Sequence, residues 1–351
     1  MSLPSLPDVL AQSIAHFLAT KERLALARCS RQNRLLAAAP FAWLHADPIT
    51  VTVLTRVDSS NVSSGPLLRF IPISLVWSGH PTRDSAKRVS RLANRAHAVS
   101  LTTHLPTRLD EALVGQILED PGFKRLESLT LESHTRRLIE LACKLPLLTS
   151  LTLGTHLAAA DVSLLSAAAS LTNLSLDRPN PGKMSSVLEC PKLQRLAVSL
   201  FRWVDLPSFS QGAGWQRLRE LSLTPLDELA GTSADTLAVF FSCLRSLLVL
   251  SLGGQNMDPL LAQVHRIPKL RRLIIECDIW AERLPHSDDA MLSLLRSSPN
   301  LGVEWLVVLS ASVQLESILR PLAKEAGFQL LRREEPPLPA RQSLVRLVRS
   351  T

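Results

Sequence analysis

Several features that mark common classes of protein are absent from this chain of 351 residues. It has no tyrosine, and its five cysteines include no Cys-x-x-Cys pair, which argues against a disulfide framework and against a zinc module. No apolar run reaches the ~18 residues needed to span a bilayer. The amino terminus lacks the layout of a signal peptide, because Pro4, Pro7 and Asp8 interrupt it. We therefore expect free thiols in a reducing compartment, the cytosol or the nucleus.

Catalytic motifs are absent as well. The sequence contains no glycine-rich phosphate loop, no His-Glu-x-x-His and no Gly-x-Ser-x-Gly. His134 and His156 are expected near the ends of successive strands, but a metal site needs at least a third ligand, which the pattern does not offer. We expect a protein that is not an enzyme and that uses no cofactor and no metal.

The charge is moderately positive. With 39 basic and 31 acidic residues the net charge is +8, in a chain that is 46% hydrophobic and 20% charged, as folded proteins are. A surplus of this size is compatible with an anionic partner, either a nucleic acid or a membrane surface. When it is spread over many arginines it is more often a solvated surface. The expectation is therefore no nucleic-acid partner and no membrane partner.

A leucine pattern recurs along the middle of the chain. It reads leucine, two residues, leucine, one residue, leucine, and it begins at Leu126. The seven copies are Leu126, Leu129 and Leu131; Leu148, Leu151 and Leu153; Leu171, Leu174 and Leu176; Leu193, Leu196 and Val198; Leu218, Leu221 and Leu223; Leu247, Leu250 and Leu252; and Leu270, Leu273 and Ile275. Their first members are, by subtraction, 22, 23, 22, 25, 29 and 23 residues apart. Such spacing predicts a short strand whose alternate residues point inward, after one more inward leucine.

This array resembles the leucine-rich-repeat family, in which each unit is one strand with one helical or irregular return. Unrelated strands in an ordinary α/β domain would not keep a near-constant spacing. Several returns have helical composition, namely Thr135–Lys144, Ala158–Ala169, Ala234–Cys243, Pro259–His265 and Asp288–Leu295. We therefore predict an α/β leucine-rich-repeat solenoid with parallel inner strands and outer helices.

The ends of this solenoid can also be predicted. Residues 126–330 form the repeat region, with a last irregular strand over Leu301–Leu309 and a closing helix over Leu315–Ala326 that Gly327 ends. Residues 331–351 are a basic tail rich in proline and arginine, which we expect to be frayed; the alternative is a basic peptide that binds a partner. Residues 46–125 are expected to be degenerate lead-in repeats, with strands around Ile49–Val53 and Ile71–Leu75 and a basic helix over Asp84–Ala96.

The pattern also predicts which side chains point to the face of the strands opposite the leucines. The third, fifth and seventh residues of each copy point away from the leucines. Of these 21 residues four are acidic and two are basic, a net charge of −2 in a chain of +8. The candidate target-binding residues are Glu132, Thr152, Asp177, Arg195, Glu220, Arg272 and Glu276. The small polar residues among the 21 either leave room for a partner's side chains or merely suit a crowded sheet.

The first 45 residues differ from the rest. Ser5 and Pro7 suit a helix start, and Leu10, Ile14 and Leu18 then fall on one helix face. Two further helical stretches follow, and Pro40 ends the last of them. Three helices in so short a segment have little interior, so the apolar residues that they cannot cover should face a partner.

At these residues the segment resembles an F-box, the helical module that docks on a Skp1-like adaptor in cullin-RING ubiquitin ligases. The matching positions are Leu6, Pro7, Leu10, Ile14, Leu18, Leu24, Cys29, Leu35, Pro40 and Trp43. The resemblance implies a non-catalytic substrate-recognition subunit of an SCF-type ligase, whose repeats bind an unknown protein target. The alternative is a leucine-rich-repeat scaffold without a role in ubiquitin transfer, in which residues 1–45 only cap the solenoid.

Overall fold

The structure is a computed structural model. It describes residues 49–54, 72–78, 82–95, 97–104, 111–132, 134–154, 163–179, 184–202, 213–225, 232–276, 285–298, 301–308, 312–333 and 342–349. The chain divides into two compact units, residues 1–154 and residues 155–351. The expected helical module of residues 1–45 lies outside the described residues.

The first unit is a parallel sheet in which each strand pairs with its neighbours in the sequence. Its strands are β1 (Ile49–Leu54), β2 (Pro72–Ser78), β3 (His97–His104), β4 (Ser128–Leu131) and β5 (Ser150–Leu153). Its helices are α4 (Arg83–Arg95), α5 (Glu111–Leu118), a 3-10 helix (Pro121–Phe123) and α6 (Arg136–Cys143). The strands expected near residues 49–53 and 71–75 and the helix expected at residues 84–96 are confirmed.

The second unit continues the same alternation of strand and return. Its parallel strands are β6 (Asn173–Asp177), β7 (Arg195–Phe201), β8 (Glu220–Pro225), β9 (Val249–Leu252), β10 (Arg272–Glu276) and β11 (Gly302–Val308). Its α-helical returns are α8 (Met184–Val187), α10 (Ala234–Cys243), α11 (Asp258–Leu261) and α12 (Asp288–Ser297). Three 3-10 helices, Ser163–Ala167, Ala213–Arg217 and Val264–Arg266, complete the returns.

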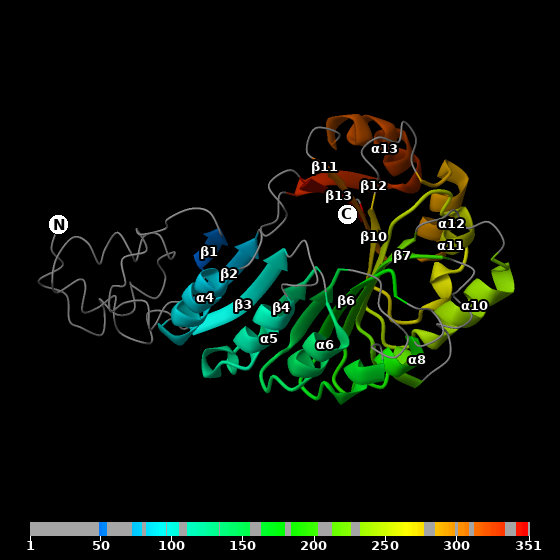
Figure 1. Cartoon of the computed structure of the whole chain (residues 1–351). Helices are drawn as coiled ribbons and strands as arrows, with labels where there is room; N and C mark the ends of the chain where they lie inside the picture. Colours follow the sequence, from blue (N-terminus) through cyan, green and yellow to red (C-terminus); the bar gives the residue numbers. More distant parts are fainter. Residues whose placement is uncertain are drawn as a thin grey trace, which may run out of the picture. The chain divides into compact units, whose positions relative to one another are not determined.

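The leucines are buried as the pattern predicts. In β4, β5 and β9 buried and partly exposed residues alternate, and the buried ones are the leucines. Parallel register places equivalent leucines side by side, for example Leu129 beside Leu151 and Leu221 beside Leu250. Leu270 is the exception among the first leucines, because it is only partly buried. Within each unit the helices lie on one side of the strands (Figure 1).

Helix starts and aromatic packing position the returns. Ser233 and Ser287 cap α10 and α12 by accepting hydrogen bonds from the backbone N–H of Thr236 and Ala290, at 3.1 Å and 3.2 Å. Behind the strands, Trp215 and Phe240 meet edge to face with ring centroids 5.1 Å apart. The capping bonds fix where α10 and α12 begin, and the ring contact packs two returns against each other behind the strands.

The carboxyl-terminal region corrects one expectation. The closing helix is present as α13 (Ser312–Ala326), and Gly327 follows it with φ of +75°. The prediction of a frayed tail is wrong for residues 331–333 and 342–349, because β12 (Phe328–Arg333) and β13 (Gln342–Arg349) pair antiparallel with each other, and β13 also pairs with β11. Val345 and Leu347, on either side of Arg346, are buried, which stabilises β13.

Candidate functional site

The predicted target-binding residues lie on the side of the strands that faces away from the leucines, which we call the open face. Six of the seven are within strands, and Glu132 directly follows β4. Glu132 and Arg195 are exposed, and the other five are partly exposed. Glu132 and Thr152 belong to the first unit, and Asp177, Arg195, Glu220, Arg272 and Glu276 belong to the second. They therefore form two separate sets, one in each unit.

In the first unit the open face is lined by small polar side chains. Ser128 lies beside Ser150, and Thr130 lies beside Thr152, in the parallel register of β4 and β5. Gly154 follows β5 in close contact with the previous repeat, because a Cβ there would lie 3.0 Å from the Cα of Glu132. This part of the open face therefore has small side chains with many hydroxyl groups. Glu132, at the end of β4, is an exposed charged residue on it.

In the second unit one ion pair lies across neighbouring strands. The guanidinium Nε of Arg195 on β7 is 3.1 Å from a carboxylate oxygen of Glu220 on β8, and both side chains are at least 40% exposed. An exposed pair of this kind contributes about 0–1 kcal/mol to stability. It adds little to folding and leaves both charged groups accessible to a partner.

Glu276 is the centre of a hydroxyl cluster that spans three strands. From β10 its carboxylate accepts hydrogen bonds from Ser251 on β9 at 2.7 Å, and from Thr224 and Ser222 on β8 at 3.2 Å and 3.4 Å. Gly253 provides the room, because a Cβ there would lie 3.2 Å from Oε2 of Glu276. Charge-assisted hydrogen bonds hold the carboxylate in one orientation on the open face.

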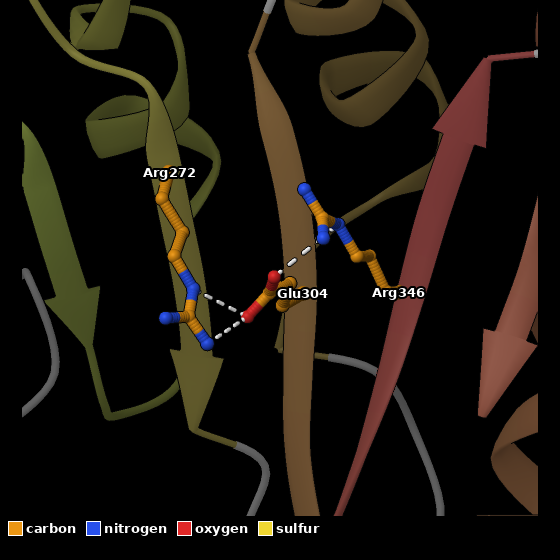
Figure 2. A network of polar contacts seen from close by, with 3 residues as sticks. All are labelled: Arg272, Glu304 and Arg346. Atoms are coloured by element: carbon orange, nitrogen blue, oxygen red, sulfur yellow. Dashed lines mark hydrogen bonds and ion pairs between the residues drawn. The ribbon is translucent and has the colours of Figure 1, made fainter. Parts of the chain in front are cut away.

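A second cluster joins the last strands of the sheet (Figure 2). Glu304 on β11 has a side chain only 5% exposed, and it lies between two arginines. Arg272 on β10 donates to Oε2 of Glu304, and Nε of Arg346 on β13 lies 3.3 Å from Oε1. Arg272, which the sequence pattern placed on the target-binding face, is therefore bound to Glu304 within this chain.

Sequence reasoning missed Glu304 and Arg346. Both lie outside the seven leucine copies, since β11 has Val303 and Trp305 where the other strands have leucines. The register pairs Ile274 with Glu304, which makes Glu304 the fifth residue of an eighth copy. A search that accepted valine and tryptophan at the inward positions would have found it, whereas Arg346 comes from an antiparallel strand that the repeat pattern does not describe.

The open face of the second unit is nearly neutral. On β6 to β11 and β13 its charged residues are Asp177, Glu220, Glu276, Glu304, Arg195, Arg272 and Arg346, which give four negative charges against three positive ones, a net of −1 on these strands. The chain as a whole carries +8. The basic surplus therefore lies away from this face, and the face does not have the positive charge with which proteins bind phosphate backbones.

Two titratable groups lie near the returns and away from the open face. Burial raises the pKa of the Cys143 thiol to about 11, and the nearby Glu140 carboxylate adds to that rise. Burial also lowers the pKa of His286, whose Nε2 accepts a hydrogen bond from Nε1–H of Trp305 at 3.1 Å. Across the described ranges, no group of three or more His, Cys, Asp or Glu side chains is placed to hold a metal ion.

Other predictions concern residues that the structure leaves undescribed or features that it does not have. The adaptor-binding set from Leu6 to Trp43 lies outside the described residues, and so does His156, so its expected place near the end of a strand stays a prediction. None of the described helices is both long enough and apolar enough to pass through a bilayer.

The comparisons with known proteins find similarity in structure only. No protein-family model and no curated protein matches the chain. A solved leucine-rich-repeat protein, LegL7 from Legionella pneumophila, aligns at 15% identity over 75% of this chain and 96% of its own, with a TM-score of 0.48. An internalin, InlF from Listeria monocytogenes, aligns at 12% identity over 66% of this chain and 73% of its own, with a TM-score of 0.30. The description as a leucine-rich-repeat solenoid rests on the strand register and the buried leucines of the chain itself.

Proposed function

We propose that the chain is a protein-recognition scaffold, that its open face binds a target protein, and that it serves as the substrate-recognition subunit of an SCF-type ubiquitin ligase. The observation that carries the first part is the open face itself. Its hydroxyl groups and the charged groups of Arg195, Glu220 and Glu276 are exposed or partly exposed, while the helices cover the leucine side. A face with a net charge near zero and many donors and acceptors suits a protein partner better than a nucleic acid.

The ligase part of the proposal is supported by the amino-terminal sequence. Residues 1–45 resemble an F-box at Leu6–Pro7 and at the apolar positions that follow. In this proposal they dock on a Skp1-like adaptor, and the other subunits of the cullin-RING complex transfer ubiquitin. This chain holds the target close to them and contributes no chemistry of its own. Such a complex operates in the cytosol or the nucleus.

Co-purification with a Skp1-like adaptor tests the ligase assignment. The full chain is expressed with the adaptor and compared with the double variant Leu6→Ala/Pro7→Ala. A matched control is Leu147→Ala, which removes a leucine whose exposed fraction is 50% in the first unit. We expect the adaptor to remain bound to the wild type and to the control and to be lost from the double variant. If the wild type retains no adaptor, the chain is a leucine-rich-repeat scaffold outside the ubiquitin pathway.

A charge exchange tests the open face. The double variant Arg195→Glu/Glu220→Arg keeps an ion pair between β7 and β8 but reverses the charges that a target meets. The control Arg136→Glu/Glu140→Arg reverses the pair on α6, whose two charged groups are 3.1 Å apart. Proximity labelling with and without a proteasome inhibitor identifies the targets of the wild type. We expect their recovery to fall for the open-face exchange alone, and equal recovery for both variants would contradict the assignment of this face.

A further inference from the structure

The second unit has a strand whose outer edge is unpaired within the described residues. In that unit the sheet ends in the order β11, β13, β12, and β13 pairs antiparallel on both sides. β12 pairs with β13 along Phe328–Arg333, and no other described strand lies along its second side. The outward backbone N–H and C=O groups of such an edge can pair with a strand from another chain.

A cavity opens beside the first half of this strand. Its volume is about 510 Å³, and it is lined by Arg320, Ala323 and Lys324 of α13 and by the segment Gly327–Leu330. Arg320 and Lys324 are both exposed, and no carboxylate is among the lining residues. The cavity therefore combines positive charge with the start of a free backbone edge.

The arrangement follows from the local sequence. Arg320 and Lys324 are four residues apart on α13, so they lie on the same side of the helix. Gly327 turns the chain from α13 into β12 with φ of +75°, a backbone conformation that other residues rarely adopt. Glu325, the acid that follows Lys324, lies 3.6 Å from Arg296 of α12. The helix end and the strand edge thus stay close, with both cations at the cavity.

Charge decides between the possible occupants of the edge. If a second copy paired its β12 antiparallel with this one about the strand centre, Phe328 and Gln329 would lie beside Arg333 and Arg332 of that copy. Because side chains alternate between the two faces of a strand, one of these two positions would be on the face where Arg320 and Lys324 of α13 lie, and like charges brought together oppose association. An acidic strand in the same place would bring carboxylates to the two cations instead.

We propose that the free edge of β12 binds an extended acidic segment of a partner protein. Its backbone pairs with the edge of β12 as one more strand, and its alternate carboxylates meet Arg320 and Lys324. Specificity comes from charge at every second residue, because side chains alternate between the two faces of a strand. This site goes beyond the proposed function, since neither the open face nor residues 1–45 take part in it.

The test measures binding of a labelled ten-residue probe peptide of alternating Glu and Val to the full chain by fluorescence anisotropy. A Lys-Val peptide of the same length tests the charge sign. Two further Glu-Val peptides, one N-methylated on its valines and one on its glutamates, test backbone pairing without any change to the protein, because successive N–H groups of a strand point to opposite edges. The variant Arg320→Gln/Lys324→Gln removes the two charges, and Lys87→Gln/Arg91→Gln removes two exposed cations of α4 as the matched control.

We expect the Glu-Val peptide to bind, and the Lys-Val peptide not to bind. The Arg320→Gln/Lys324→Gln variant should weaken binding by about threefold to tenfold, as expected for two partly screened ion pairs, while the α4 control leaves it unchanged. One of the two N-methylated peptides should bind about tenfold more weakly or worse, because it loses several backbone hydrogen bonds to β12 at once. The proposal is overturned if the Glu-Val peptide does not bind, if the Arg320/Lys324 and α4 variants lose affinity equally, or if N-methylation has no effect. It is also overturned if light scattering shows a dimer that dissociates on substitutions in β12.

Discussion

At the scale of single residues, an added Cβ at Gly214 would come closer to other atoms than at the other glycines compared in the described part of the chain. It lies in the 3-10 helix Ala213–Arg217, and a Cβ there would be 2.1 Å from the carbonyl oxygen of Leu188 and 2.5 Å from its Cβ. The approach brings one return against the previous one behind the strands. The backbone itself would have to move to make room, which distinguishes Gly214 from glycines that only permit a turn.

The first prediction is that Gly214→Ala lowers the free energy of unfolding by about 1–3 kcal/mol through overpacking. Urea denaturation monitored by tryptophan fluorescence measures it. Gly115→Ala is the matched control, because Gly115 lies within α5 and its added Cβ meets only ordinary contacts at 3.6 Å or more. There we expect a gain of about 0.5–1 kcal/mol, since alanine suits a helix better than glycine. Equal effects of the two substitutions would contradict the packing described for Gly214.

The second prediction concerns pH and His286. Burial lowers the pKa of this histidine in the folded state, against the opposing influence of the Ser287 carbonyl and the Asp258 and Asp288 carboxylates. The unfolded chain therefore binds a proton on His286 at a higher pH than the folded chain does. The stability that the neutral ring contributes is present above the ordinary pKa of about 6.5 and is lost as the pH falls below it.

Substitution of His286 by Gln tests this prediction. Glutamine does not titrate, and its side-chain oxygen can accept the hydrogen bond that Trp305 now donates to Nε2. Between about pH 7.5 and about pH 5.5, the urea midpoint of the wild type should fall further than that of His286→Gln. Parallel midpoints over this range would show that the proton taken up by His286 on unfolding does not matter for stability.

Part of the candidate site could be predicted at this scale. The alternation of the strands placed Glu220 and Glu276 on the open face correctly, because side-chain direction follows from position along a strand. The alternation did not predict that the Glu276 carboxylate accepts hydrogen bonds from Ser222, Thr224 and Ser251. Those contacts depend on lateral register and on the room left by Gly253, and neither is visible in a single repeat.

At the scale of elements, the strands were predictable and the returns less so. Each leucine copy marks a strand because inward residues must alternate in any strand with one buried face. The returns have no such constraint, and the helix expected over Ala158–Ala169 is in its described part a 3-10 helix, Ser163–Ala167. β13 was missed because its arginines suggested a solvated tail, while its burial depends on antiparallel pairing with β11 and β12.

The third prediction tests how Glu304 joins β10, β11 and β13. Each of Arg272→Met and Arg346→Met leaves Glu304 with one remaining arginine, whereas the double variant leaves a nearly buried carboxylate with neither. A buried charge deprived of its partners costs about 3–5 kcal/mol. We therefore expect the double variant to lose more stability than the two single losses together. Urea denaturation of the four proteins measures this difference.

A control separates charge from packing in this cluster. Adding Glu304→Gln to the double variant removes the carboxylate charge and keeps a side chain of similar size on β11. If the uncompensated charge is the cause, this triple variant recovers most of the lost stability. Additive losses in the single and double variants, or no recovery in the triple variant, would contradict the role given to Glu304.

At the scale of the whole molecule, the second unit behaves as a stack in which each repeat contacts mainly its neighbours. In such an array stability is approximately the sum of repeat and interface contributions, and an exposed end destabilises the repeats nearest to it. β11, whose Trp305 is fully buried, is followed in the sheet by β13 and β12. These two antiparallel strands, with α13, therefore close the end of the array.

The last prediction is that removing residues 342–351 destabilises the second unit in a graded way. The deletion exposes the edge of β11 and removes Val345 and Leu347, each of which contributes about 1.5–3 kcal/mol by burial. Glu304 also loses Arg346. Hydrogen exchange followed by mass spectrometry should show the largest loss of protection in β11 and β10, a smaller loss in β8, and none in β3 and β4.

A deletion of Ser350 and Thr351 alone, which leaves β13 whole, should change nothing. Uniform loss of protection from β3 to β11 would show that the repeats unfold as one cooperative block, which contradicts nearest-neighbour stabilisation along the array.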